Sequence, residues 1–243
     1  MIQSTIWVLS CLLTINSFLV DYSPAIKVAD EVTIKSIDDF EIDGAGAAEA
    51  WSLTKWIHLP PLKGVNEAYE TKVKILYSST GIYFLFWCED DKITATLQND
   101  FADLYNEDVV EVFLWTNEAH PVYFEYELSP LNYELPIMVP NLDSTFMGWK
   151  PWHYEGDRLT RHATQVQGGE KVSGAVINSW TAEFFIPYKL LKPLTNVPPS
   201  KGTRWRANMY RLDYDQSASV GFAWQPVRTN FHDYQSYGTF IFD

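Results

Sequence analysis

Apolar and polar residues alternate in short segments of this chain, and this alternation constrains its fold more than any other feature. The segment Lys72–Tyr77 places its valine, isoleucine and tyrosine on one side and its lysines on the other. Ser78–Gly81 has the composition of a turn, and Ile82–Cys88 follows as a fully apolar run. A period of two residues is typical of a strand. The two segments therefore predict an antiparallel hairpin.

A second pair of segments shows the same pattern. Val109–Trp115 and Val122–Leu128 are joined by Thr116–Pro121. In the later segment alternate residues are apolar or aromatic, whereas Glu125 and Glu127 lie on the opposite face. This patterning predicts strands with one face on a core.

The remaining chain predicts more short strands and no sustained helix. The polar, proline- and glycine-rich stretch from Ser129 to Gly174 is interpreted as a long functional or decorative loop. Tyr188–Leu191 suggests a single helical turn. The further predicted strands are Val32–Ile37, Ser179–Ile186, Arg204–Leu212, Val220–Trp224 and Tyr237–Phe242. The fold class is therefore all-β: one jelly-roll-like β-sandwich of mainly antiparallel strands with long decorated loops.

Length, charge and cysteine content limit the possible functions. A chain of 243 residues fits one domain, and its aromatic content of 16% suits both a β core and a sugar site. The formal net charge of -13 argues against a nucleic-acid partner and against anionic lipid surfaces. Cys11 would be lost or lipidated on export, and the one remaining cysteine, Cys88, cannot form an internal disulfide. Cys88 is interpreted as a small buried hydrophobe.

The N-terminus predicts export. The apolar run from Ile6 to Val20 has the length of a signal-peptide core and is short for a membrane span. Val8–Cys11 also resembles a lipoprotein cleavage site. Residues 1–21 are therefore predicted to be a signal peptide or lipoprotein leader, and residues 22–243 the mature domain. The protein is expected in the periplasm, on the cell surface or outside the cell.

Several kinds of enzyme are disfavoured by the motifs. The histidines show no HExxH or other close ligand spacing, and the chain has no GxSxG elbow, P-loop or dinucleotide fingerprint. Glycoside chemistry needs two facing carboxylates, for which Asp108, Glu111, Glu125 and Glu127 are candidates. The same acids could instead accept bonds from arginines or face solvent. Sugar binding without cleavage needs only aromatic faces and a few fixed polar groups.

The order of short motifs along the chain resembles that of carbohydrate-binding modules of family 9. The likeness covers roughly Val32 to Asp243. The motifs are Ile42–Gly44 with Glu49–Trp51, Thr71–Tyr77 with Gly81–Phe84, Asn106–Phe113, Tyr123–Pro130, Trp180–Pro187, Trp205–Arg211, and Trp224 with Phe231–His232 and Tyr237–Phe240.

The resemblance implies a non-catalytic sandwich that binds oligosaccharide or polysaccharide ends. Such modules are attached to glycoside hydrolases or occur in single-domain exported bacterial proteins. The implied partners are therefore a glycoside hydrolase or outer-surface glycan-utilisation proteins. Structural calcium is possible, with no ligands assigned. Glycoside processing by Asp108, Glu111 or Glu125 remains an alternative, as does a scaffold domain whose sugar site has decayed.

The resemblance also implies a site. Family members hold a sugar between two tryptophans, and these positions are Tyr105 and Phe231 here. The family's acid of the "DsvEvF" strand is Glu111. His232 and Trp224 complete the expected ligand-binding set, and no residue is expected to be catalytic. The expected supporting polar residues are Asp108, Glu125, Arg206, Asn208 and Arg211.

Purely structural roles, without ligand binding, remain alternatives for these residues. Glu111 could form a salt bridge with Arg206 or Arg211 instead of binding a ligand. Tyr105 and Phe231 could be ordinary packing residues. Asp108 is expected to fix the turn into its strand, Asp43 and Gly44 to form a turn, and Trp51 to be core.

The leader can be tested directly. We expect the mature protein to lack the residues before about Asp21, because the run from Ile6 to Val20 has the length of a cleaved signal core. Intact-mass measurement of the native protein checks this. A soluble cytoplasmic form that keeps Met1 would contradict it.

Overall fold

The computed structural model describes residues 29–62, 69–143, 145–152, 155–215 and 219–243. The predicted leader, residues 1–21, lies outside this part of the chain, so its cleavage stays a prediction. No helix among the described residues has the length and apolarity needed to cross a bilayer.

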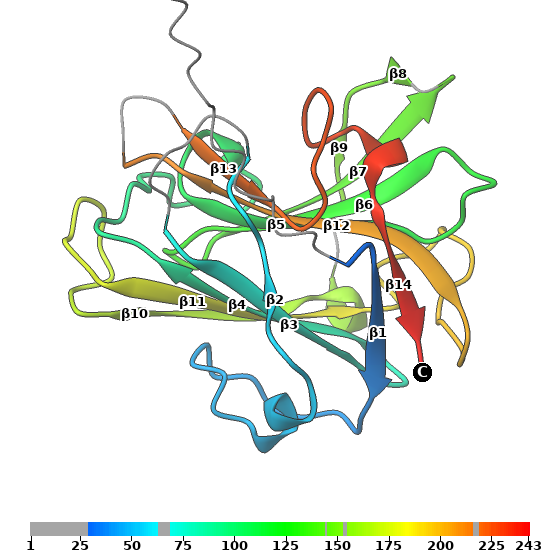
Figure 1. Cartoon of the computed structure of the whole chain (residues 1–243), viewed down its shortest axis with the longest axis horizontal. Coiled ribbons are helices and arrows are strands. Elements are labelled where there is room, and N and C mark those ends of the chain that lie inside the picture. Colours follow the sequence, from blue (N-terminus) through cyan, green and yellow to red (C-terminus); the bar gives the residue numbers. More distant parts are fainter. Residues whose placement is uncertain (1–28, 63–68, 144, 153–154, 216–218) are drawn as a thin grey trace, which may run out of the picture.

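The described chain is built almost entirely of strands, as the sequence predicted (Figure 1). Short 3-10 turns η1 (Glu49–Leu53), η2 (Leu104–Asn106), η3 (Gly156–Arg158) and η4 (Tyr234–Ser236) interrupt them. The strands are β1 (Glu31–Ser36), β2 (Ile57–His58), β3 (Thr71–Tyr77), β4 (Gly81–Glu89), β5 (Val109–Trp115), β6 (Val122–Leu128), β7 (Glu134–Leu142), β8 (Thr145–Phe146), β9 (Lys150–Pro151), β10 (Arg161–Gln167), β11 (Ser179–Pro187), β12 (Arg204–Asp213), β13 (Val220–Ala223) and β14 (Gly238–Phe242).

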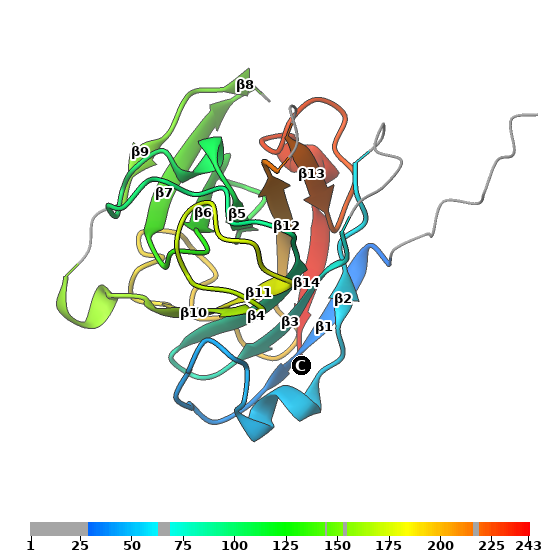
Figure 2. The same ribbon diagram turned by 90° about the vertical axis from the view of Figure 1, so that its left-hand side faces the viewer.

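The strands form two layers. The first sheet has the order β7-β6-β5-β12-β14-β1, and the second has the order β10-β11-β4-β3-β1. Strand β1 belongs to both sheets, since its first residues pair with β14 and Lys35 and Ser36 pair with β3. Both pairings of β1 are parallel and the other ladders are antiparallel. The predicted β-sandwich of mainly antiparallel strands is confirmed, and Figures 1 and 2 show its two layers.

The predicted hairpins are confirmed, but the long loop is corrected. Val73 pairs with Phe86 in the hairpin of β3 and β4. The stretch after Ser129 contains β7 and β10, which add a strand to each sheet. Pro136 and Pro140 hid β7 because proline is rare within sheets. The segment Tyr188–Leu191 forms turns rather than a helix.

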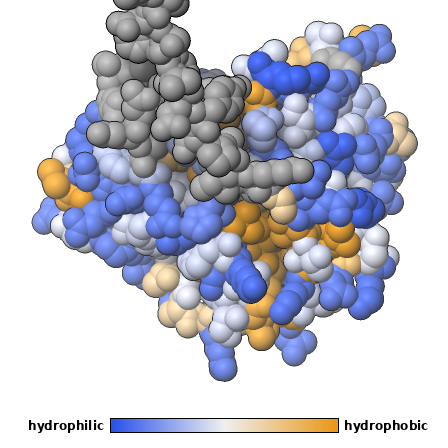
Figure 3. Space-filling view, viewed as in Figure 1, coloured by the Kyte–Doolittle hydropathy of each residue, from blue (hydrophilic) through white to orange (hydrophobic). Residues whose placement is uncertain are grey.

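The main core lies between the sheets. Alternate residues of β5, such as Val110 and Val112, point into it, as do Phe124 of β6 and Phe84 of β4. Cys88 is also completely buried there, as predicted. Much of the outer surface is polar, although apolar side chains gather in a strip between β2 and β14 on the face shown in Figure 3.

The outer face of the second sheet is covered by the segment that contains η1. Trp51, predicted to be core, is 2% exposed and packs with Tyr83 and Phe185. Its Nε1–H donates to Glu183 Oε1 over 2.7 Å. The predicted turn at Gly44 is confirmed, with a φ of +80° that favours glycine. The part of the second sheet's outer face around Tyr83 and Phe185 is therefore covered.

Glu183 fastens this covering segment to the second sheet. Besides Trp51, it accepts the backbone N–H groups of Asp43 and Gly44 at 2.9 and 2.8 Å. Glu183→Ala leaves these three donors, and the more distant backbone N–H of Gly46 at 3.3 Å, without this acceptor, so we expect a loss of roughly 3 kcal/mol in the free energy of unfolding. Denaturant titration measures it. Glu49→Ala, at an exposed position of the same segment, is the control, and equal losses in both variants would contradict the prediction.

Candidate functional site

A pocket of about 500 Å³ opens on the outer face of the first sheet. Its floor is formed by side chains of β5, β6 and β7, including Glu111, Phe113, Glu125 and Glu127. Its rim comes from η2, from the β8 region and from the loop between β13 and β14. Figure 2 shows β8 and this loop rising above the first sheet. Segments far apart in the sequence thus meet around one cavity.

The strand period explains why carboxyl groups gather on the floor. Glu111 and Phe113 share the outer face of β5, whereas Val110 and Val112 face the core. In the ladder with β6, Glu111 pairs with Glu127 and Phe113 pairs with Glu125. Side chains in such cross-strand positions are close neighbours. Two strands therefore bring three carboxyl groups together.

These carboxyl groups are buried without adequate partners. Glu111 is 2% exposed, Glu125 3% and Glu127 0%. Oε2 of Glu125 and both carboxyl oxygens of Glu127 have no hydrogen-bond partner among the described residues. A buried polar atom without a partner is costly. The floor is thus arranged to accept donors from something other than the residues around it.

Burial shifts the acidity of all three groups. It raises the pKa of Glu111 to about 8. Burial also raises the pKa of Glu125 well above its ordinary value, and the nearby charge of Glu111 adds to this. For Glu127 burial is again the main cause of the raised pKa, followed by the charges of Glu111 and Glu125. The backbone N–H of Tyr105 lowers the pKa of Glu127 by a smaller amount, although it is not positioned to form a hydrogen bond with that carboxyl group.

His232 lies beside the acids without neutralising them. Its Nδ1 is 2.7 Å from the Tyr123 hydroxyl and 3.7 Å from Oε2 of Glu125. Burial lowers the pKa of His232 to about 4, so the ring is uncharged at neutral pH. Its backbone N–H donates to Asn230 Oδ1 at 2.9 Å, which fixes the end of the loop.

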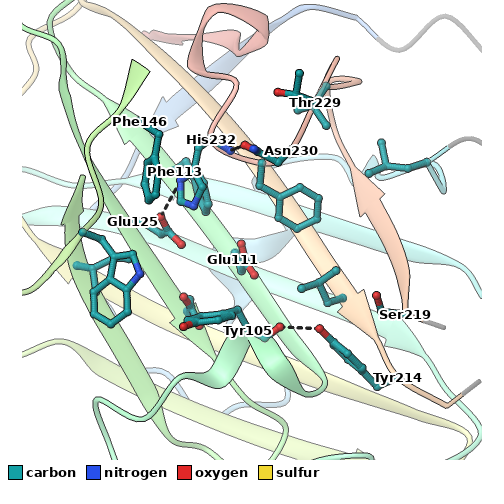
Figure 4. A pocket seen from close by; sticks show the side chains of 17 residues that line it. Tyr105, Glu111, Phe113, Glu125, Phe146, Tyr214, Ser219, Thr229, Asn230 and His232 are labelled. Atoms are coloured by element: carbon teal, nitrogen blue, oxygen red, sulfur yellow. Dashed lines mark hydrogen bonds and ion pairs between the residues drawn. The ribbon is translucent and has the colours of Figure 1, made fainter. Parts of the chain in front are cut away.

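Aromatic rings form the sides of the pocket. The ring of Phe231 stacks on Tyr210 at 4.0 Å, and its carbonyl accepts the Tyr210 hydroxyl at 3.1 Å. The carbonyl of Tyr105 accepts the Tyr214 hydroxyl at 2.7 Å. Figure 4 shows Glu111 and Glu125 between Tyr105 on one side and His232 with Phe146 on the other. Rings thus face each other across an acidic floor.

The structure brings most of the predicted ligand-binding residues into this one pocket. Tyr105, Glu111, Phe231 and His232 all line it. Glu125, predicted to support the site, also lines the pocket itself. Whether these side chains bind a ligand stays a prediction.

The structure corrects the predicted placement of Trp224 in the ligand-binding set. The structure places it in the core between the sheets, 0% exposed, with its ring centroid 5.5 Å from that of Phe240. Its indole also packs against Gly238, where an added Cβ would come within 2.4 Å of it. Trp224 therefore cannot line the pocket, because it lies on the core side of the first sheet.

Three of the predicted supporting residues hold the edges of the pocket in place. Asp108 accepts the backbone N–H groups of Thr94 at 2.5 Å and Tyr214 at 2.8 Å, in line with its predicted turn-fixing role. Asn208 donates to the Tyr210 hydroxyl at 2.7 Å, beneath Phe231. Arg206 donates to backbone carbonyls of the segment before β14, including that of Gln235 at 3.2 Å.

The structure also corrects the predicted placement of Arg211 among the residues that support the site. Arg211 lies on the core side of β12, where it pairs with Asp90 at 3.0 Å and with Asp213 at 2.5 Å. Arg206 pairs with Glu118 at 3.4 Å. In the part of the chain that the structure describes, no ion pair joins either arginine to Glu111. The salt-bridge alternative for Glu111 is therefore wrong.

Sequence reasoning left several lining residues out of the site. Glu127 could have been included, because it shares a strand face with Glu125. Trp149 lies in the long loop, and its ring is 6.4 Å from that of Tyr105. Phe146 stacks on His232 at 4.2 Å. No local pattern in the sequence marks these two loop aromatics as neighbours of the acids.

A separate acidic cluster lies at the end of β12. Oxygen atoms of Asp90, Asp213 and Asp215 lie within 4.8 Å of one another, which is close enough for one metal ion. Arg211 already binds two of these carboxylates, and Lys92 Nζ lies 3.6 Å from Asp215. The cluster therefore has cations of its own, and it does not fit a calcium site well. Structural calcium stays a prediction without assigned ligands.

Comparison with known proteins agrees with the fold. The sequence profile described as "Carbohydrate family 9 binding domain-like" matches residues 42–240. The chain belongs to this family. No curated protein shows significant sequence similarity to the chain.

Solved structures share the fold of this family 9 domain. A protein from Bacteroides uniformis described as carbohydrate-binding is 14% identical, with a TM-score of 0.69 over 88% of this chain and 99% of that one. A family 9 carbohydrate-binding module from Caldicellulosiruptor kristjanssonii, solved with cellotriose, is 15% identical, with a TM-score of 0.63 over 88% and 93% of the two chains. The same kind of module solved with glucose is 16% identical, with a TM-score of 0.62 over 88% and 95%.

The raised pKa of Glu111 predicts a pH-dependent stability. Its pKa rises from 4.5 in the unfolded chain to about 8 when folded, so between these values the native state holds a proton that the unfolded state has lost. The free energy of unfolding should therefore fall as pH rises, by up to about 1.4 kcal/mol per pH unit for each such proton. Glu111→Gln should flatten this slope.

Denaturant titrations between pH 7 and pH 8 measure the slope above the ordinary pKa of histidine. Other buried acids, such as Asp108 with a pKa raised to about 8, contribute to the slope of both proteins, so the difference between the two slopes reports Glu111. The exposed substitution Glu170→Gln is the control and should keep the slope of the parent protein. An unchanged slope in Glu111→Gln would show that this carboxyl group is already ionised in the native state.

Proposed function

We propose that this protein binds carbohydrate in the pocket on the first sheet and does not cleave it. The observation that carries the proposal is the pairing of aromatic sides with a floor of buried carboxyl groups that lack partners. Ring faces pack against the C–H surface of a pyranose, and carboxylates accept its hydroxyl hydrogens.

The size of the pocket favours a short ligand or a chain end. A volume of about 500 Å³ lies within the range of small-molecule sites. The structurally similar modules from Caldicellulosiruptor kristjanssonii were solved with cellotriose and with glucose. Membership of the same family supports a ligand of this class. We therefore propose the end of an oligosaccharide or polysaccharide as the ligand.

The arrangement of the acids supports binding rather than catalysis. A glycosidase places its two carboxyl groups on either side of the scissile bond. Here Glu111, Glu125 and Glu127 come from adjacent strands and form one floor. A sugar would rest on them rather than between them. Glycoside processing with Glu111 or Glu125 remains the alternative, and a scaffold domain with a decayed site would bind no sugar.

Membership of the family supports a proposal for the wider setting. We propose that the protein is exported to the periplasm, the cell surface or the medium. There it would support glycan or polysaccharide breakdown by holding chain ends near a glycoside hydrolase or near surface glycan-utilisation proteins.

Substitutions at the rim and floor test the site. Tyr105→Ala and Phe231→Ala each remove ring area, which contributes roughly 25 cal/mol per Å² buried. Above about pH 8, where Glu111 is ionised, Glu111→Gln removes a charged acceptor worth about 1.5–3 kcal/mol, or roughly one to two powers of ten in affinity. Calorimetry with glucose, cellotriose and xylo- and manno-oligosaccharides measures these losses, and thermal melts report whether each variant folds.

The control is Trp87→Ala. Trp87 lies on the outer face of the second sheet, with Lys72 Nζ 4.1 Å from its ring, and its loss should not change the affinity. The same sugars should remain uncut on long incubation. Cleavage that disappears in Glu111→Gln would favour the enzyme alternative. Unchanged affinity in all three pocket variants would place the site elsewhere.

A further inference from the structure

The charges around the pocket are all of one sign. None of the seventeen described residues that line it is a lysine or an arginine. The lining acids are Glu111, Glu125 and Glu127, and the only lining histidine, His232, is uncharged at neutral pH. The whole chain is also acidic, with a formal net charge of -13. Among the described lining residues the pocket thus has no cation of its own that would repel a positively charged ligand.

The acids lack the partners that buried carboxylates usually have. Elsewhere in the described chain such groups are satisfied: Glu183 accepts several N–H groups, and Glu134 accepts the Tyr126 hydroxyl at 2.6 Å. By contrast, Oε2 of Glu125 and both oxygens of Glu127 have no hydrogen-bond donor among the described residues, although both side chains line the pocket. Three like charges cannot remain ionised together in such a place unless a cation joins them.

A metal ion is not the best fit for this cation. Among the described residues the one group with three carboxylates close enough to share an ion is Asp90, Asp213 and Asp215, outside the pocket. The oxygens of the three floor glutamates do not converge in that way. The ligand must therefore spread its donors over the floor while its apolar surface meets the rings.

A neutral sugar satisfies only part of this requirement. Its hydroxyl groups donate hydrogen bonds, but they bring no charge, so the acids would have to keep their protons or remain buried as uncompensated anions. A protonated amine brings a positive charge and three donors together. The surrounding rings of Tyr105, Trp149 and Phe231 would also attract a cation through their faces.

We propose that the pocket selects a sugar that carries a free, protonated amino group, such as a glucosamine unit at the end of a chain. The inference rests on the proposed function, because it takes the site to bind sugars, and it adds the class of sugar. The floor glutamates together accept the ammonium group and hydroxyl hydrogens of one sugar, and the aromatic sides hold its ring.

Calorimetry with the whole protein tests this. Glucosamine, N-acetylglucosamine and glucose differ only at the second carbon, so their comparison isolates the charge. We expect glucosamine to bind about tenfold or more tightly than either neutral sugar. Its affinity should fall between about 50 and about 500 mM NaCl, whereas the affinity of glucose should not, because salt screens charge–charge attraction.

Two matched variants connect the preference to the floor. Glu127→Gln keeps the side-chain shape and removes one charge, so the ratio of glucosamine to glucose affinity should fall by about tenfold. Glu134→Gln changes an equally buried glutamate of β7 that does not line the pocket, and it should keep the ratio. Circular dichroism and melts show that each variant is folded before the ratio is compared.

The outcomes separate the two proposals. If glucose or cellotriose binds as tightly as glucosamine, the amine inference is wrong while sugar binding stands. If added calcium strengthens glucose binding and a chelator removes it, a metal takes the place of the amine and the inference is also wrong. If none of these sugars or their oligomers binds, the proposed function fails together with the inference.

Discussion

The alternation of side chains along β5 and β6 is the constraint on which the rest of the structure depends. Each strand sends one set of residues, such as Val112 and Phe124, into the core between the sheets and the other set, such as Glu111 and Glu125, to the outer face. A shift of one residue in the register would exchange the two sets. It would bury three carboxyl groups in the core and expose its apolar residues. Fold and site are therefore specified by the same pairing.

The stability of the sandwich and the demands of the pocket oppose each other on these strands. The core between the sheets is continuous and aromatic, and the second sheet is sealed outside by the segment that carries Trp51. The floor of the pocket instead destabilises the fold, since it buries the carboxyl group of Glu127 without a hydrogen-bond partner. Sites that bind polar ligands commonly keep such destabilising groups, and the surrounding fold offsets their cost.

Much of the fold could be predicted because its strands carry a clear period. Val109–Trp115 and Val122–Leu128 were placed to the residue, and the period also put Glu125 and Glu127 on one face. Strand β7 was missed because its two prolines obscure the pattern, although its partner β6 supplies the pairing. Pattern predicts a strand most securely where no residue breaks the period.

The candidate site was predicted in part, for a related reason. The strand-borne Glu111 and the motif-borne Tyr105 and Phe231 were found, whereas Trp224 was assigned to the wrong side of its sheet. Arg211 was not recognised as the partner of Asp90, because that contact joins residues distant in sequence. The aromatic residues of the loops, Phe146 and Trp149, reach the site through tertiary packing, which the short-range pattern of the sequence does not predict.

The division of the pocket between strands and loops has a consequence for how such a domain can change over time. The acidic residues of the pocket lie on paired strands, whereas its rim is formed by β8 and by the loop before β14. Insertions and substitutions accumulate far more easily in loops than in paired strands. Descendants of one ancestor could therefore reshape the opening many times while inheriting the same electrostatic character. In such a lineage, ligand size would diverge early, and ligand charge would be the trait that persists.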